Sequence, residues 1–178
     1  MTDPLSAKTF VGGTSGNDDL RANSQDTDGS YLFARGGDDI LRGGKYDDVL
    51  TGGAGSDQYY GGAGADQFRF FGYDVTTGDR DRVYDLNFSD GDTIVFGSFA
   101  TDTFADAAGI NAYTNGTAAT ISSFEGLANM VNDADAVWAT RKGTTDLLIL
   151  HVTVGTETQT IEISNAYSAY VAAGGLIG

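Results

Sequence analysis

An aspartate recurs at every ninth position in the glycine-rich part of the chain, and this spacing limits what the chain can fold into. The aspartates are Asp39, Asp48, Asp57 and Asp66, and each is followed two positions later by a large apolar or aromatic residue. Pairs of glycines recur with the same period, at 43–44, 52–53 and 61–62. A period of nine fits neither the 3.6-residue repeat of an α-helix nor the alternation of a β-strand. It indicates a repeat architecture.

The repeat continues toward the N-terminus in a weaker form. The segment 13–21 matches the pattern, with Asp18 and Leu20 in the expected slots. Twelve residues, 22–33, then stand where nine would be expected, and Ser30 takes the aspartate slot. We interpret this segment as a degenerate repeat with three extra residues. The apolar slots are then Leu20, Leu32, Leu41, Leu50, Tyr59 and Phe68.

Each repeat has a half that favours a turn and a half that favours a strand. Glycine permits positive φ and close approach of the backbone, so the GGxGxD half predicts a turn. The other half predicts a strand of about three residues whose central side chain points inward. Two repeats complete one coil, because the chain must turn twice to return. The pattern therefore predicts an all-β roll with two parallel sheets and a thin core of the apolar slots.

The stacking of coils places the aspartates in two columns. Asp39 is expected above Asp57 on one edge, and Asp48 above Asp66 on the other. Asp18 lies under Asp39 if the three extra residues bulge outward. A close pair of carboxylates repels by about 4 kcal/mol at an effective dielectric of 20. Carboxylates and backbone carbonyls without nitrogen or sulfur ligands indicate a hard cation, and a flexible all-oxygen site favours Ca²⁺ over Mg²⁺.

The segments GGAGSDQYY (52–60) and GGAGADQFR (61–69) resemble the GGxGxDxUx nonapeptide of the RTX, or haemolysin-type, calcium-binding proteins. The resemblance covers residues 13–69 and extends more weakly through 70–96. It implies a right-handed parallel β-roll with Ca²⁺ between stacked turns. It also implies secretion through a type I exporter that reads an uncleaved C-terminal signal.

The resemblance also implies a set of calcium ligands. The implied carboxylate ligands are Asp18, Asp39, Asp48, Asp57 and Asp66, and the implied carbonyl ligands come from Gly37, Gly43, Gly52, Gly55, Gly61 and Gly64. It favours Asp81, Asp85 or Asp92 as further ligands or end caps. Lys45, Tyr46 and Ser30 depart from the pattern on the Asp48–Asp66 edge. Tyr46 stands in a slot that favours positive φ. We therefore expect the Asp18–Asp39–Asp57 edge to hold calcium more securely.

Composition excludes several classes of function. Acidic residues outnumber basic ones by 25 to 10, giving a net charge of −15. This balance argues against nucleic acid and against an anionic membrane as partners. There is no cysteine and the one histidine is His151, which excludes cysteine-ligated zinc and the HExxH motif. No apolar run reaches the ~20 residues of a membrane span. We find no catalytic constellation.

The chain divides into four parts: a lead at 1–12, the roll at 13–69, a roll-closing segment at 70–98, and a C-terminal part at 99–178. In the last part, residues 122–134 favour a helix that Ser122 or Ser123 can cap. Residues 136–141, 146–154 and 159–164 favour strands of a small antiparallel cap on the roll. The tail 166–178 fits a strand, a short helix or part of an export signal. We expect Trp138 in the core and His151 on the polar face of a strand.

Three functions fit these observations. The first is a secreted, non-enzymatic calcium-binding module that folds on binding calcium and has an extracellular structural or adhesive role. The second is the C-terminal calcium-binding and export portion of a larger extracellular enzyme, such as a protease, lipase or alginate epimerase. The third is a carbohydrate-binding module, with extracellular polysaccharide or a cell surface as the partner. Its aromatic candidates are Tyr59, Tyr60, Phe68, Phe70, Phe71 and Tyr73.

Overall fold

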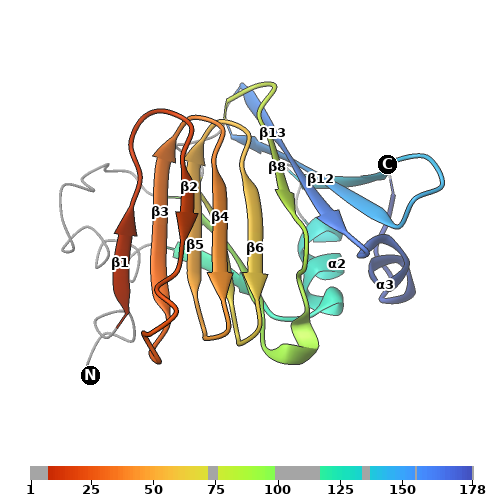
Figure 1. Cartoon of the computed structure of the whole chain (residues 1–178). Helices are drawn as coiled ribbons and strands as arrows, with labels where there is room; N and C mark the ends of the chain where they lie inside the picture. Colours follow the sequence, from red (N-terminus) through yellow and green to blue (C-terminus); the bar gives the residue numbers. More distant parts are fainter. Residues whose placement is uncertain (1–7, 72–75, 99–116, 134–136, 155, 178) are drawn as a thin grey trace.

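In the computed structural model the chain winds into a roll of two stacked β-sheets (Figure 1). The structure describes residues 8–71, 76–98, 117–133, 137–154 and 156–177. Sheet A contains, in spatial order, β1 (Thr9–Gly12), β3 (Ser30–Gly36), β5 (Val49–Ala54), β7 (Gln67–Phe71), β9 (Thr93–Ser98) and β10 (Thr117–Ile121). Sheet B contains β11 (Val137–Arg141), β12 (Leu147–Val154), β13 (Glu157–Ser164), β8 (Arg80–Val83), β6 (Gln58–Gly62), β4 (Ile40–Gly44) and β2 (Asp19–Arg21).

Successive repeats alternate between the two sheets, as the period of nine predicts. Leu32 pairs with Leu50 in sheet A, and Leu41 pairs with Tyr59 in sheet B, both in parallel register. In each case the partners occupy the same slot two repeats apart, so two repeats do complete one coil. Leu20 pairs with Leu41 in the same way, which shows that the irregular segment between them bulges out of the coil.

The apolar slots form the core of the roll. Leu32, Leu41, Leu50 and Phe68 have no exposed surface, and Tyr59 is 1% exposed. Leu20 is also buried, although it lies in an edge strand. Burying one such side chain stabilises the fold by roughly 1.5–3 kcal/mol. The six predicted core positions are therefore confirmed.

Two longer coils follow the nonapeptides. Tyr59 in β6 pairs with Val83 in β8, and Phe68 in β7 pairs with Ile94 in β9, so each of these coils exceeds two nonapeptides in length. Val83 and Ile94 are fully buried and continue the same core. A short 3-10 helix, η1 (Phe88–Asp90), lies in the second of these coils. The coils stay stacked because the additional residues lie between the strands.

The C-terminal part supplies the cap that the sequence predicts. β13 pairs in parallel with β8 and extends sheet B, and β12 and β11 then add antiparallel strands. Helix α2 (Phe124–Asp133) and helix α3 (Tyr167–Ala172) lie at this end of the roll (Figure 1). Ser123 Oγ accepts a hydrogen bond from the Gly126 amide at 3.0 Å, so Ser123 caps α2. No helix in the described ranges is long and apolar enough to span a membrane.

Trp138 corrects one expectation. Its side chain is 40% exposed, so the prediction of a core position is wrong. The neighbouring Ala139 points inward and is buried, and alternation along β11 therefore turns Trp138 outward. The Trp138 ring stacks on His151 with centroids 5.0 Å apart. His151 Nε2 lies 3.0 Å from Thr140 Oγ1, which agrees with its predicted place on the polar face of a strand.

Candidate metal centre

The first column of aspartates lies on the edge where the strands of sheet B begin. The Asp18 amide donates to Asp39 Oδ1 at 2.7 Å, and the Asp39 amide donates to Asp57 Oδ1 at 2.9 Å. The Asp57 amide donates to Asp81 Oδ1, also at 2.9 Å. Each carboxylate thus holds the backbone of the preceding coil, and Asp81 continues the column.

The second column has the same construction on the opposite edge. The Ser30 amide donates to Asp48 Oδ1 at 2.6 Å, and the Asp48 amide to Asp66 Oδ1 at 2.8 Å. The Asp66 amide donates to Asp92 Oδ1 at 2.9 Å. Asp81 and Asp92 therefore occupy aspartate slots although the regular spacing is lost before them. The structure brings the predicted carboxylates together in two columns.

The inner members of the columns leave one oxygen open. Asp39, Asp48 and Asp66 are at most 2% exposed, yet their Oδ2 atoms accept no hydrogen bond within the described part of the chain. A buried acceptor without a partner costs about 1–3 kcal/mol, and more when it is charged. The chain thus keeps three carboxylate oxygens away from water without a donor of its own, and a cation would satisfy them.

The outer members differ, because the protein itself supplies donors to their Oδ2 atoms. Asp18 Oδ2 accepts from the Thr14 amide at 2.7 Å and from its hydroxyl at 2.9 Å. Asp92 Oδ2 accepts from the Asn87 amide at 2.7 Å. Asp81 Oδ2 accepts from the Gln159 side chain. These contacts favour an end-capping role for the outer aspartates over a ligand role.

Glycine is required beside the carboxylates because the space is filled. A Cβ on Gly52 would lie 2.0 Å from Asp57 Oδ2, and one on Gly61 would lie 2.5 Å from Asp66 Oδ2. The first glycine of the repeat therefore lies directly against the carboxylate, and a side chain at this position has no space. Gly43 has the same place, at 2.7 Å from Asp48 Oδ2.

Backbone carbonyls lie in the same gaps between turns. A Cβ on Gly55 would lie 2.3 Å from the Gly37 carbonyl oxygen, and one on Gly64 would lie 2.9 Å from the Tyr46 carbonyl oxygen. A Cβ on Gly43 would likewise lie 2.3 Å from the Gly61 carbonyl oxygen. Among the described residues no three acidic or histidine side chains converge on one point. A cation here would therefore combine carboxylates with carbonyls.

Burial raises the pKa of the inner carboxyls. Loss of hydration raises the pKa of Asp39 to about 6, against the lowering effect of the hydrogen bond from the Asp18 amide. The same cause raises the pKa of Asp66 to about 7, with the charges of Asp92 and Asp48 adding to it. Burial also raises the pKa of Asp48 and of Asp92. Without a cation, burial therefore moves the ionisation of these carboxyls toward neutral pH.

A second set of polar side chains, which the sequence analysis did not identify, also joins the coils. They stand directly before the aspartate slot. Asn17 Oδ1 accepts from the Asp38 amide and Asp38 Oδ1 from the Ser56 amide, both at 2.9 Å. Asp47 Oδ1 accepts from the Ala65 amide at 2.8 Å. The signal was present in the sequence as a polar residue with the same period of nine.

Asp85 holds a turn from the following coil. Its Oδ1 accepts from the Gly61 amide at 2.9 Å and its Oδ2 from the Gly62 amide at 3.0 Å. The carboxylate thus binds two adjacent backbone donors of the 61–66 turn. This arrangement agrees with the end-cap alternative for Asp85.

Arg35, which is not a glycine, has positive φ, and Tyr46 does not. Apart from glycine, the described residues with positive φ are Arg35, at 80°, and Asn165, at 58°. Arg35 pairs with Gly53, whose φ is 105°, so an arginine stands in a slot that glycine fills in the next coil. Its guanidinium donates to the Gly13 carbonyl at 2.8 Å. The glycines in the slot equivalent to Tyr46, namely Gly37, Gly55 and Gly64, do have positive φ as expected, but Tyr46 itself does not.

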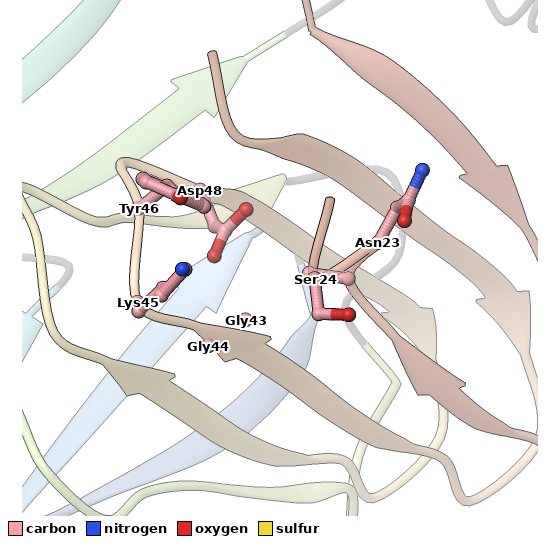
Figure 2. A pocket seen from close by; sticks show the side chains of 8 residues that line it. Asn23, Ser24, Gly43, Gly44, Lys45, Tyr46 and Asp48 are labelled. Atoms are coloured by element: carbon pink, nitrogen blue, oxygen red, sulfur yellow. The ribbon is translucent and has the colours of Figure 1, made fainter. Parts of the chain in front are cut away.

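The first gap of the second column contains a cation of the chain itself. Lys8 Nζ donates to the Asp28 carbonyl at 2.9 Å and to the Asp47 carbonyl. This ammonium lies beside the coil in which Ser30 replaces aspartate. A cavity of about 210 Å³ opens between the same two coils, and Figure 2 shows the Asp48 carboxylate pointing into it near Lys45.

A roll of two parallel sheets with buried carboxylates and carbonyls between its turns defines a cation-binding β-solenoid. The comparison with protein families specifies the class: residues 33–68 match the RTX calcium-binding nonapeptide repeat in four copies. Residues 33–68 therefore carry repeats of the calcium-binding RTX type. No curated protein matches the sequence.

A solved structure shares the fold. It is the crystal structure of the extracellular lipase LipA from Serratia marcescens, with a TM-score of 0.51 and 19% sequence identity. The match covers 95% of this chain and 20% of the lipase chain. The chain thus corresponds to about one fifth of that protein's length.

Proposed function

We propose that this chain is a calcium-dependent folding module of a secreted protein, and that it acts through its structure and not through catalysis. The open Oδ2 atoms of Asp39, Asp48 and Asp66 carry this proposal. They are buried, they lie on both edges of the roll, and they occupy the slot that gives the repeat its period. A polar position left open this regularly favours a ligand over a packing defect.

The inner aspartates Asp39, Asp48, Asp57 and Asp66 are the proposed carboxylate ligands. The carbonyls of the glycine-rich turns, including Gly37 and Gly61, complete the site. Calcium, when bound, supplies the positive charge that offsets the repulsion within each column. Asp18, Asp81 and Asp92 then close the ends of the columns through their contacts with Thr14, Gln159 and Asn87.

The proposed location is outside the cell. Free calcium is scarce in cytoplasm, so weak sites stay empty there and the roll stays expanded. An expanded chain suits a narrow type I exporter, and folding on calcium outside opposes its return. We propose that residues 120–178 carry the information that the exporter recognises. RTX repeats are typical of proteins secreted in this way, which supports this assignment.

The chain as part of a larger secreted enzyme is the second candidate. The comparison with the extracellular lipase favours it, because nearly the whole of this chain matches one fifth of that protein. In this case the module supports the folding and the export of an enzyme whose catalytic residues lie in another part of the larger protein. Intact mass of the native protein separates the two candidates.

A calcium titration followed by far-ultraviolet circular dichroism tests the proposed function. We expect an expanded chain in chelator and a cooperative gain of β-structure at millimolar Ca²⁺, with Mg²⁺ as the matched control. Metal binding supplies folding free energy when the site exists only in the folded state. Identical spectra and melting temperatures in chelator and in calcium would refute the proposal.

A further inference from the structure

Half of the basic side chains of this acidic chain contact one face of the roll. The chain has 10 lysines and arginines and a net charge of −15. Five of them lie on the outer side of sheet B, namely Arg21, Arg42, Arg80, Arg82 and Lys142. Their ion pairs involve two acidic residues, Asp19 and Glu162. This face therefore has an excess of positive charge, although the molecule as a whole is strongly negative.

Strand register places these side chains outward. Ala139, Leu150 and Ile161 pair across β11, β12 and β13 and are buried in the core. Successive side chains of a strand point to opposite faces, so the cross-strand rows on either side of this buried row point outward. One of these rows ends at Arg80 in β8, and the other ends at Arg82. Figure 1 shows β2, β4, β6 and β8 side by side, so the basic residues follow one another across the strands.

Four of the outward side chains form a continuous stack. The Arg42 guanidinium lies 4.9 Å from the Tyr60 ring centre, and the Tyr60 and Tyr84 rings stack at 4.4 Å with 9° between their planes. The Arg82 guanidinium lies 4.7 Å from the Tyr84 ring centre. Each guanidinium has one close partner in the protein, since Arg42 Nε lies 3.3 Å from Asp19 and Arg82 Nε donates to Ser164 Oγ at 3.3 Å. Both side chains are about one third exposed, so the other N–H groups of the fork can reach a ligand.

Glu162 holds a second group of cations. It is 3% exposed, and its carboxylate lies 3.2 Å from Arg80, 3.7 Å from Arg82 and 3.5 Å from Lys142. One carboxylate cannot neutralise three cations. The side chains of Arg80 and Lys142 are 58% and 53% exposed, so their remaining donors reach solvent.

The positive strip is narrow because acidic turns border it. The strands β2, β4, β6 and β8 begin directly after Asp18, Asp39, Asp57 and Asp79, and β4 and β6 lead into the turns that hold Asp48 and Asp66. The strip runs across the strands, along the axis of the roll. From β2 to β13 it is about 19 Å long at 4.8 Å per strand.

We propose that this face, defined by Arg21, Arg42, Arg80, Arg82 and Lys142, binds a linear polysaccharide whose sugars carry carboxylates. Guanidinium forks match carboxylates in a bidentate geometry. A single chain with one charge per sugar fits a narrow row of cations. The inference does not depend on calcium being the ligand of the aspartate columns.

The face is poorly suited to nucleic acid or to a lipid surface. Bases bind by stacking on open aromatic faces, but Tyr60 and Tyr84 cover each other and their outer faces carry Arg42 and Arg82. A flat anionic membrane would approach the acidic turns on both sides of the strip. The rings proposed from sequence as a sugar platform do not serve either, because Tyr59, Phe68, Phe70 and Phe71 are buried. Tyr73 lies outside the described residues.

Binding of oligogalacturonate to the full chain tests this proposal. The oligomer is chosen too short to gel with calcium, and calorimetry is done at millimolar Ca²⁺. We expect R42Q/R82Q to weaken binding about tenfold, which corresponds to ~1.4 kcal/mol. The matched control K45Q/R141Q removes the same charge elsewhere and should bind as the unaltered protein does. The methyl-esterified oligomer, which lacks the carboxylates, should not bind.

Three results would overturn the proposal: equal binding by R42Q/R82Q and the unaltered protein, equal loss in the control, or tighter binding of oligo-dT than of oligogalacturonate. The calcium response in circular dichroism is recorded for every variant. If R42Q/R82Q does not fold, R80Q/K142Q takes its place, because both side chains are largely exposed. A failure of the proposed calcium function would appear as a missing response in the unaltered protein, separate from polymer binding.

Discussion

At the scale of the residue, three of the inner aspartates use their two carboxylate oxygens differently. Oδ1 accepts the amide of the preceding coil, as Asp66 Oδ1 does from Asp48 at 2.8 Å. Oδ2 is buried and open in Asp39, Asp48 and Asp66. The first contact holds the stack together, and the second makes the metal-free stack costly. This division explains why the slot requires aspartate, since asparagine retains only the first contact.

Asp66→Asn should change stability with opposite sign in chelator and in calcium. At pH 8 in chelator, we expect a stabilisation of about 1–2 kcal/mol, because a buried charge without a partner is removed while Oδ1 remains. In calcium, we expect a loss of similar size, because a charged ligand is gone. Because the chain is expanded in chelator, refolding by the osmolyte TMAO measures the first effect, and thermal denaturation in calcium measures the second.

The control for Asp66→Asn is Asp19→Asn, since Asp19 is exposed and pairs with Arg21 and Arg42. It should leave stability nearly unchanged, and equally so in both buffers, because an exposed ion pair contributes little. A shift of the same sign for Asp66→Asn in chelator and in calcium would mean that its open oxygen is not a metal position.

Arg35 allows a test of backbone strain. Its φ of 80° favours glycine, so Arg35→Gly should be more stable than Arg35→Ala by about 1 kcal/mol. Both variants lose the contact with the Gly13 carbonyl, so their difference isolates the backbone. Chemical denaturation in calcium compares them, and equal midpoints would show that the left-handed conformation is not retained in solution.

At the scale of the element, the nonapeptide coils could be predicted and the longer ones could not. The anchors Leu32, Leu41 and Leu50 occupy equivalent slots of a local repeat, so their burial and register follow from the sequence. Asp81 and Asp92 stand further from their partners than two nonapeptides, and no period identifies them. The parallel pairing of β13 with β8 joins segments from opposite halves of the chain, and no local pattern encodes it.

The candidate site was predictable to the same extent. The slot chemistry identified both columns, because glycine and aspartate are needed at fixed offsets. It could not show that Lys8 lies beside the second column, since this contact depends on the irregular segment 22–33. It also did not show that Thr14 closes Asp18, because position 14 lies outside the glycine and aspartate slots. We expected the Asp18–Asp39–Asp57 edge to hold calcium more securely than the Asp48–Asp66 edge. The structure shows no such difference, because open carboxylate oxygens lie on both edges.

Leu50→Asp should abolish the calcium-induced folding transition. Leu50 has no exposed surface and pairs with Leu32 and Phe68 in adjacent coils, so a carboxylate there would be buried without a partner. The cost is roughly 3 kcal/mol or more. Leu176→Asp is the matched control, because Leu176 is 67% exposed. A normal transition in Leu50→Asp would show that position 50 does not face the core.

At the scale of the whole molecule, the net charge of −15 acts against compactness unless cations are bound. The acidic turns lie at the two edges, and the basic strip lies on the outer face of sheet B. The two surfaces therefore respond to different partners. Calcium acts between the turns, and a polyanion acts on the face between them.

Stability should depend on pH in opposite ways with and without calcium. The pKa of Asp39 is about 6 and that of Asp66 about 7 in the folded state, both raised by burial from 3.8. The unfolded chain therefore ionises first, and the metal-free protein loses stability as pH rises from about 4 to 7. In calcium, stability should rise over the same range, because the metal binds the ionised form. Osmolyte refolding in chelator and thermal denaturation in calcium, each at several pH values, check this, and a pH dependence of the same sign in the two buffers would contradict it.

The central claim is that calcium between the aspartate columns folds the roll, and amide hydrogen exchange of the full chain tests it most directly. The amides of Asp39, Asp48, Asp57 and Asp66 donate across the columns, so their protection reports on the stacking itself. The account predicts fast exchange at these amides in chelator and strong protection in millimolar calcium, with Mg²⁺ giving little change. Equal protection of these amides in chelator and in calcium would contradict it.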